Sequence, residues 1–125
     1  MVKVAQIGLG YFSQFHLAAW QAHPKVTALA ATDLDPDRRQ WARERGVDVH
    51  ADPHAVLQVL APDIVDIVAP PPAHRALLEQ ALAPGRLVIC QKPFCTSLQE
   101  AEEMVHLAEA RGASLIIHEN FRFQP

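Results

Sequence analysis

Glycine and small residues are grouped in one short segment near the start of the chain, Gly-Leu-Gly-Tyr-Phe-Ser at residues 8–13. The segment separates an apolar, β-branched run from a stretch with helical periodicity, so it lies at a strand-to-helix turn. Gly8 permits a sharp bend, Gly10 lets a ligand approach the backbone, and the small Ser13 allows close helix–strand packing. Unpaired N–H groups at a helix start attract anions. The spacing therefore predicts a pyrophosphate-binding turn, with Ser13 as a mild departure from Gly or Ala.

An acidic residue follows the second predicted strand. Asp33 comes 20 residues after Ser13, where a carboxylate can accept hydrogen bonds from ribose hydroxyls. The two features together predict a dinucleotide site, although a plain β–α turn can need glycine for its own geometry. Asp33 would repel a 2′-phosphate, which favours NAD over NADP. Arg38 and Arg39 either soften that preference or are solvated arginines of the next helix.

Short β-branched runs alternate with helix-period segments along the whole chain. Because no hairpin signal joins two strands, this α/β alternation predicts a doubly wound parallel sheet with strand order 3-2-1-4-5-6 in a three-layer αβα arrangement. The predicted strands are Val2–Ile7, Val26–Thr32, Val47–His50, Ile64–Val68, Arg86–Cys90 and Ser114–His118. The predicted helices cover Tyr11–Ala22, the stretch from Asp35 to Gly46, the stretch from Asp52 to Leu60, Ala73–Ala83, and a long helix ending at Gly112.

Capping signals mark where the helices begin. Asp-Pro pairs at residues 35–36 and 52–53 each supply an N-cap followed by proline in the first turn. For the long helix, Thr96 with Gln99 and Ser97 with Glu100 both fit a capping box. Two apolar helix faces are also predicted, one formed by Phe12, Phe15 and Ala19, the other by Leu98, Ala101, Val105 and Ala108.

Composition excludes several classes of protein. The 125 residues are 50% apolar and 20% charged, with a formal charge of −3, which suits one globular domain and argues against a nucleic-acid or anionic-membrane surface. No apolar run approaches the roughly 18 residues that span a bilayer. Cys90 and Cys95 form no disulfide framework, so a reducing, cytoplasmic location is expected.

Metal and nucleophile signals are weak. The seven histidines form no metal-binding pair, and the two cysteines lack the spacing of a zinc knuckle, so no metal is expected. His16 and Trp20, four residues apart, have a spacing more often used for packing than for chemistry.

The segment Val88–Pro93, which ends in Gln-Lys-Pro before a capped helix, resembles the Glu-Lys-Pro motif of the Gfo/Idh/MocA oxidoreductases. The glycine turn, Thr32-Asp33 and the segment Ala69–His74 fall where that family has them. His118–Pro125 also looks like the family's junction into a second domain. The resemblance covers essentially all 125 residues.

The resemblance implies an NAD(P)-dependent dehydrogenase or reductase acting on a sugar- or polyol-like small molecule. It implies a Rossmann domain over residues 1–118 and the start of a junction over residues 119–125. The family's C-terminal α/β domain, which holds the substrate and makes the oligomer contact, is absent from this sequence. Because the chain stops just after a strand, we expect a fragment of a homo-oligomeric protein, binding NAD weakly and turning over no substrate alone.

By the same resemblance, Lys92 is the catalytic lysine beside the nicotinamide, where its charge would stabilise a developing alkoxide. Gln91 departs from the family's glutamate, which puts charge coupling with Lys92 in doubt. The peptide bond before Pro93 is either cis or trans, and a cis bond would aim Lys92 into the cleft. Asn120 and Arg122 are expected at the substrate edge. The expected cofactor-binding residues are Gly8, Gly10, Tyr11, Phe12, Ser13, Asp33, Arg38, Pro70, Pro71, His74, Gln91, Lys92 and Pro93.

Two other functions remain open at this point. A non-catalytic nucleotide sensor or transcriptional co-regulator could keep this fold, and Gln91 favours it while the intact Lys92-Pro93 opposes it. Another Rossmann enzyme, linked to CoA or NADP, could share only the glycine turn.

Overall fold

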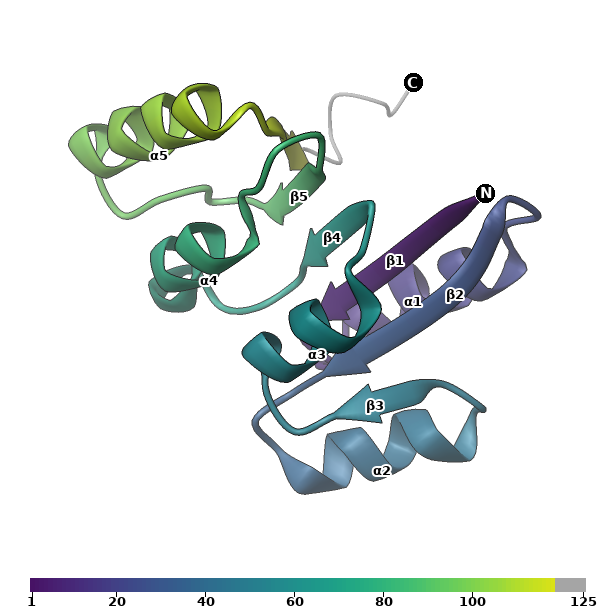
Figure 1. The fold of residues 1–125 in the computed structure, drawn as a ribbon. Helices are drawn as coiled ribbons and strands as arrows, with labels where there is room; N and C mark the ends of the chain where they lie inside the picture. Colours follow the sequence, from purple (N-terminus) through teal and green to yellow (C-terminus); the bar gives the residue numbers. More distant parts are fainter. Residues whose placement is uncertain (119–125) are drawn as a thin grey trace, which may run out of the picture.

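Six parallel strands form one sheet in the order β3-β2-β1-β4-β5-β6 (Figure 1). The structure, a computed structural model, describes residues 1–118. The predicted strand order is confirmed, and every neighbouring pair is parallel because each connection crosses over through a helix or loop. The strands are β1 (Val2–Ile7), β2 (Val26–Thr32), β3 (Asp48–His50), β4 (Ile64–Ile67), β5 (Leu87–Gln91) and β6 (Ser114–His118).

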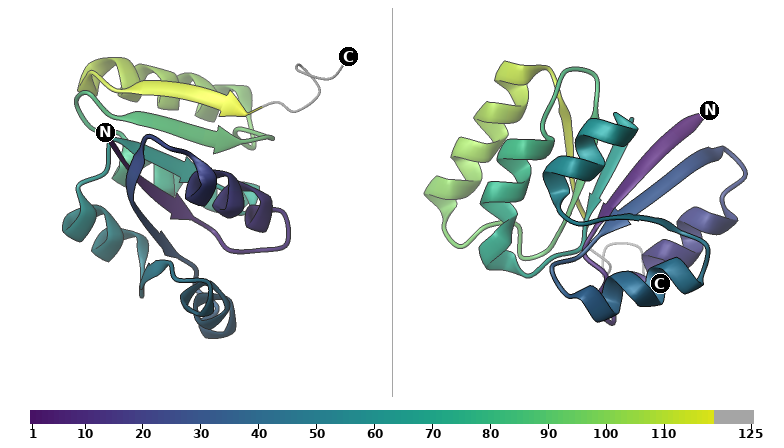
Figure 2. Two further views of the ribbon diagram at one scale, coloured as in Figure 1. Left: turned by 90° about the vertical axis from the view of Figure 1, so that its right-hand side faces the viewer. Right: turned by 60° about the horizontal axis from the view of Figure 1, so that its bottom comes forward.

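Helices lie on both faces of the sheet, which gives the three predicted layers (Figure 2). Val56 of α3, Leu78 of α4 and Met104 of α5 pack on one face, and Leu17 of α1 and Ala42 of α2 pack on the other. The helices are α1 (Ser13–Ala22), α2 (Pro36–Glu44), α3 (Pro53–Leu60), the 3₁₀ turn η1 (Pro71–Ala73), α4 (His74–Ala81) and α5 (Leu98–Arg111).

The predicted helix starts agree with the structure at three caps. Asp35 and Asp52 accept hydrogen bonds from backbone N–H groups in the first turns of α2 and α3. Ser97, rather than Thr96, caps α5, because its side chain accepts from the Glu100 N–H at 3.1 Å. Of the two cap residues that fit the sequence, the structure therefore has Ser97.

One predicted apolar face is only partly right and the other is wrong. In α5, the predicted Ala108 is buried, but Leu98 is 76% exposed and Val105 44% exposed, and Met104 is buried instead. In α1, Phe12 and Phe15 are both 57% exposed, and Leu17 takes the buried position. Each error is a rotation of the helix by about one position, since periodicity alone does not say which side of a mixed helix meets the sheet.

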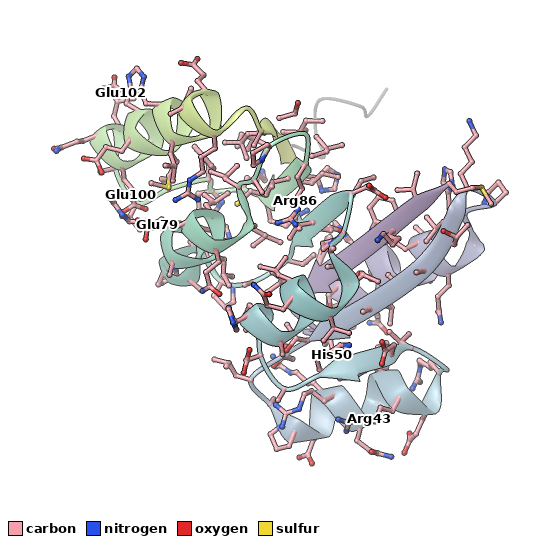
Figure 3. The ribbon with its side chains drawn as sticks, viewed as in Figure 1. Arg43, His50, Glu79, Arg86, Glu100 and Glu102 are labelled. Atoms are coloured by element: carbon pink, nitrogen blue, oxygen red, sulfur yellow. The ribbon has the colours of Figure 1, made fainter. Side chains whose placement is uncertain are left out.

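Arg86 stabilises the edge of the sheet where the strands begin. Its guanidinium donates to the Ala81 carbonyl at 2.9 Å and the Pro62 carbonyl at 3.0 Å, and partial burial lowers its pKa. Figure 3 shows Arg86 beside the strands, while Glu102 extends from the outer side of α5. The arginine thus joins the end of α4 to the loop that enters β4.

Candidate cofactor-binding site

A cavity of about 760 Å³ opens where β1, β2, β4 and β5 end. Ligands of open parallel sheets bind at this edge, and the volume suits a small molecule or cofactor. Residues expected there that do line the cavity are Gly8, Gly10, Tyr11, Phe12, Ser13, Asp33, Arg38, Pro70, Gln91 and Lys92. Lining residues that the sequence did not indicate include Thr32, Leu34, Pro53, Ala73 and Leu77.

The two glycines of the turn have different reasons to be glycine. Gly8 has φ +113°, and an added Cβ would lie 2.5 Å from the Val68 carbonyl oxygen, so the fold itself excludes a side chain. At Gly10 an added Cβ would meet only the Arg38 guanidinium, at 3.6 Å. Because packing within the chain does not require glycine at position 10, the space above it is available to a ligand.

Helix α1 begins at the cavity without a side-chain cap. Phe12 occupies the N-cap position and makes no side-chain hydrogen bond, and the first turn carries no acidic residue. The Ser13 hydroxyl is buried and donates to the Gly10 carbonyl, which closes the turn instead of facing a ligand. This leaves the positive helix end open to an anion.

Asp33 faces the glycine turn. Its Oδ2 accepts from the Leu9 N–H at 2.7 Å and its Oδ1 from the Asp35 N–H at 2.8 Å. Arg39 donates to the Asp33 carbonyl oxygen at 2.8 Å. Arg39 is therefore not a freely solvated arginine; it holds the end of β2 in place.

Arg38 lies on the cavity wall. Its Nη1 is 3.8 Å from Asp33 Oδ2 and its Nε 3.8 Å from Asp35 Oδ2, with the side chain 52% exposed. One guanidinium therefore stands between two carboxylates.

The segment after β4 lines the cavity with a different set of residues than expected: Val68, Ala69, Pro70 and Ala73. Pro71 and His74 do not line the cavity, which corrects the expectation that they do. His74 is fully buried, with Nδ1 3.0 Å from the Phe94 carbonyl oxygen and Nε2 2.7 Å from that of Ala69. It joins the β4 loop to the loop after Lys92, and Pro70 takes the place at the cavity.

The end of β5 brings Gln91 and Lys92 to the cavity wall. The Lys92–Pro93 peptide bond is cis, and Pro93 itself is not a lining residue. Cys95, in the same loop, is no nucleophile, because burial raises the pKa of its thiol to about 11. Lys92 and Arg38 are the two basic residues among those that line the cavity.

A buried polar group behind the cavity escaped the sequence analysis. Asp66 in β4 is 1% exposed, and its Oδ2 lies 2.8 Å from His16 Nδ1 and 2.8 Å from Trp20 Nε1. Gln91 Nε2 lies 3.4 Å from His16 Nε2 and also contacts His118 Nδ1. The packing expectation for His16 and Trp20 is thus too simple. A charged residue inside the apolar run 64–67 was the available signal.

Some expectations lie beyond what the structure tests. Asn120 and Arg122 fall outside the described residues 1–118. Within those residues no group of His, Cys, Asp or Glu side chains could hold a metal ion. No helix there is both long and apolar enough to cross a membrane.

Comparison with known proteins identifies the family. The model of an oxidoreductase family with an NAD-binding Rossmann fold matches residues 2–119. The chain belongs to the Gfo/Idh/MocA oxidoreductases. D-apiose dehydrogenase from Paraburkholderia graminis is 41% identical over 98% of this chain, which covers 33% of that enzyme.

Solved structures of Gfo/Idh/MocA and related oxidoreductases share the fold. An oxidoreductase from Agrobacterium radiobacter in complex with NAD⁺, L-tartaric acid and magnesium is 37% identical, with TM-score 0.90 over 98% of this chain and 36% of that one. Scyllo-inositol dehydrogenase from Lactobacillus casei with NAD(H) and scyllo-inositol is 26% identical, with TM-score 0.87 over 99% and 38% of the chains. This chain spans about a third of the length of such relatives.

The residues present fit a dinucleotide. The open space at Gly10, the uncapped start of α1 and the Asp33 carboxylate lie together on one cavity. These are the elements that hold a pyrophosphate and a ribose in this fold. NAD(H) accompanies the same fold in structural neighbours.

Proposed function

We propose that this chain binds NAD in the cavity at residues 8–13 and forms the cofactor-binding part of a dehydrogenase or reductase. The observation that carries the proposal is the hydrogen bond from the Leu9 N–H to the Asp33 carboxylate. It holds an acceptor for ribose hydroxyls beside the turn whose N–H groups would receive the diphosphate. Gly10 and the start of α1 would contact that diphosphate.

The charge on the wall favours NAD over NADP. A 2′-phosphate on the adenosine ribose would meet the Asp33 carboxylate, which accepts hydrogen bonds and repels anions. Arg38 offers one positive charge, but Asp33 and Asp35 both lie 3.8 Å from it. The hydrogen-bonded position of the Asp33 carboxylate at the cavity supports the preference.

The proposed reaction moves a hydride between NAD and a carbon bearing a hydroxyl or carbonyl group. NAD, when bound, supplies the hydride chemistry. The Lys92 ammonium would stabilise negative charge developing on the substrate oxygen. Relatives named for D-apiose and scyllo-inositol support a sugar- or polyol-like substrate.

The rest of the proposal concerns the longer protein. Relatives of about three times this length support a second domain that holds the substrate and makes a homo-oligomer. Hydride transfer needs the reacting atoms held roughly 3–3.5 Å apart, so we expect these 125 residues alone to bind NAD without turning over substrate. A cytoplasmic location stays a prediction.

A non-catalytic sensor with this fold is the second candidate, and Gln91 in place of glutamate is the one feature that favours it. Lys92 at the cavity wall favours the enzyme. In the longer protein, Lys92→Ala is expected to abolish turnover and preserve NAD binding. If Lys92→Ala keeps the full biological function of the longer protein, that result would support the non-catalytic sensor.

Calorimetric titration of the chain with NAD, NADP and CoA tests the binding proposal. We expect NAD to bind more tightly than NADP, and CoA not to bind. Asp33→Ala should weaken NAD binding by roughly 1–3 kcal/mol, because it removes hydrogen bonds to a charged acceptor. Asp33→Ala should also reduce the difference in affinity between NAD and NADP.

Asp37→Ala is the matched control, since Asp37 is an exposed acid of the same region that does not line the cavity. It removes the same charge and should leave NAD affinity unchanged. Equal losses in the two variants, or a preference for NADP or CoA, would contradict the proposal.

A further inference from the structure

Five polar side chains form a connected group behind the cavity. Two of them belong to α1, a helix that covers one face of the sheet (Figure 2). Asp66 comes from β4, His16 and Trp20 from α1, Gln91 from β5 and His118 from β6. We call these residues the Asp66 group. Only Gln91 among them lines the cavity, so the other four can act on a ligand only through it.

The carboxylate of Asp66 determines which nitrogen of His16 carries the proton. An ionised carboxylate only accepts hydrogen bonds, and the Trp20 indole only donates. His16 Nδ1, 2.8 Å from Asp66 Oδ2, must therefore donate as well. In the neutral form of the ring, which has one N–H, Nε2 of His16 is then left as an acceptor.

That acceptor in turn orients the Gln91 amide. The atom 3.4 Å from His16 Nε2 must be a donor, which is Gln91 Nε2 and not its oxygen. The amide nitrogen has a second hydrogen, which His118 Nδ1 accepts. Both N–H bonds are thus used on the histidines, and the amide cannot rotate to exchange its nitrogen and oxygen without losing both contacts.

We propose that Asp66 and His16 are positioning residues that fix the Gln91 side chain with its carbonyl oxygen available to the bound ligand, next to Lys92. The proposal rests on the proposed function, because the ligand is the cofactor or substrate. The group recognised is a hydrogen-bond donor, a ligand hydroxyl or amide N–H. A neutral amide performs this task without adding negative charge beside the lysine ammonium.

The protonation of His16 tests the proposal in the cofactor-free chain. Nitrogen-15 NMR of the histidine rings at neutral pH should show His16 as the neutral Nδ1–H form. In Asp66→Ala the acceptor is gone, and the ring should become a mixture containing the Nε2–H form. A wild-type ring protonated on Nε2, or an unchanged ring in Asp66→Ala, would overturn the proposal whether or not NAD binds.

Binding variants test the effect on the ligand. His16→Phe should weaken NAD binding about 3- to 10-fold, the effect of one lost neutral hydrogen bond. Trp20→Phe is the control, because it loses a hydrogen bond to the same Asp66 oxygen but makes none to Gln91. Its loss of NAD affinity should be smaller than that of His16→Phe, because the contact between Asp66 and His16 remains.

A double-mutant cycle separates positioning from general destabilisation. In a Gln91→Ala background, His16→Phe should weaken NAD binding no further, since its effect passes through the amide. Additive losses, or equal losses in His16→Phe and Trp20→Phe, would overturn the proposal and leave the proposed function intact. A wild-type chain that binds no NAD would instead refute the proposed function, and the ring NMR would still decide the protonation of His16.

Discussion

At the residue scale, the site divides into parts that local spacing reveals and parts that only the fold brings together. The turn at residues 8–13 and Asp33 were predictable, because turn geometry and the end of one strand place them. The contacts of Asp66 with His16 and of Gln91 with His16 join positions 50 and 75 residues apart. No periodicity reports such distant pairs, so the sequence analysis missed them.

The two glycines of the turn give opposite predictions. Gly8→Ala should lower the free energy of unfolding by at least about 2 kcal/mol, because the left-handed backbone and the Val68 carbonyl both exclude a Cβ. Gly10→Ala should change the free energy of unfolding by about 0.5 kcal/mol or less. It should weaken NAD binding about tenfold or more, because the added methyl group fills the space for the diphosphate. Urea unfolding and calorimetry measure the two effects. Equal losses of stability in Gly8→Ala and Gly10→Ala would contradict these different roles of the two glycines.

The two thiols should be unreactive in the folded chain. Burial raises the pKa of Cys90 to about 12 and that of Cys95 to about 11, so few thiolates exist at pH 8. Disulfide-reagent labelling at pH 8 should be far slower in the native than in the urea-unfolded chain, with Cys95→Ser isolating Cys90. Above about pH 9 unfolding releases thiol protons, so stability should fall as the pH rises towards 12. Native labelling as fast as in urea would contradict the burial.

At the element scale, the signals that mark where helices begin were more informative than the signals for their buried faces. The Asp-Pro pairs located α2 and α3, since a cap and a proline act locally. The buried face of α5 was misjudged because Met104 and Val105 are both apolar, and only contact with α4 and the sheet selects between them. The 3₁₀ turn η1, which contains Pro71 and Ala73, has no comparable sequence signal.

The choice of cap for α5 is testable by a matched pair. Ser97→Ala should lower the free energy of unfolding by about 1 kcal/mol, because it removes the acceptor of the Glu100 N–H. Thr96→Ala should have a much smaller effect, since that hydroxyl contacts only an exposed Glu100 carboxylate. Thermal or urea unfolding measures both. A larger loss in Thr96→Ala would mean that the other capping box forms.

At the scale of the whole molecule, the function follows from where the parallel strands end. The crossovers bring the turn after β1, the acid after β2 and the lysine after β5 to one edge, around one cavity. Strand order and edge were predictable from the α/β alternation. The substrate was not, because these residues correspond to a third of the relatives' length and the family's substrate contacts are expected elsewhere.

The central claim is that the dinucleotide lies across the turn at residues 8–13 with its ribose at Asp33. An NMR titration of the ¹⁵N-labelled chain with NAD tests it most directly. We predict that the largest amide shifts fall at Leu9, Gly10, Phe12 and the end of β2, and that Asp33→Ala weakens them. Shifts concentrated away from that turn, for example at the groove between Trp20 and Gly46, would contradict the account.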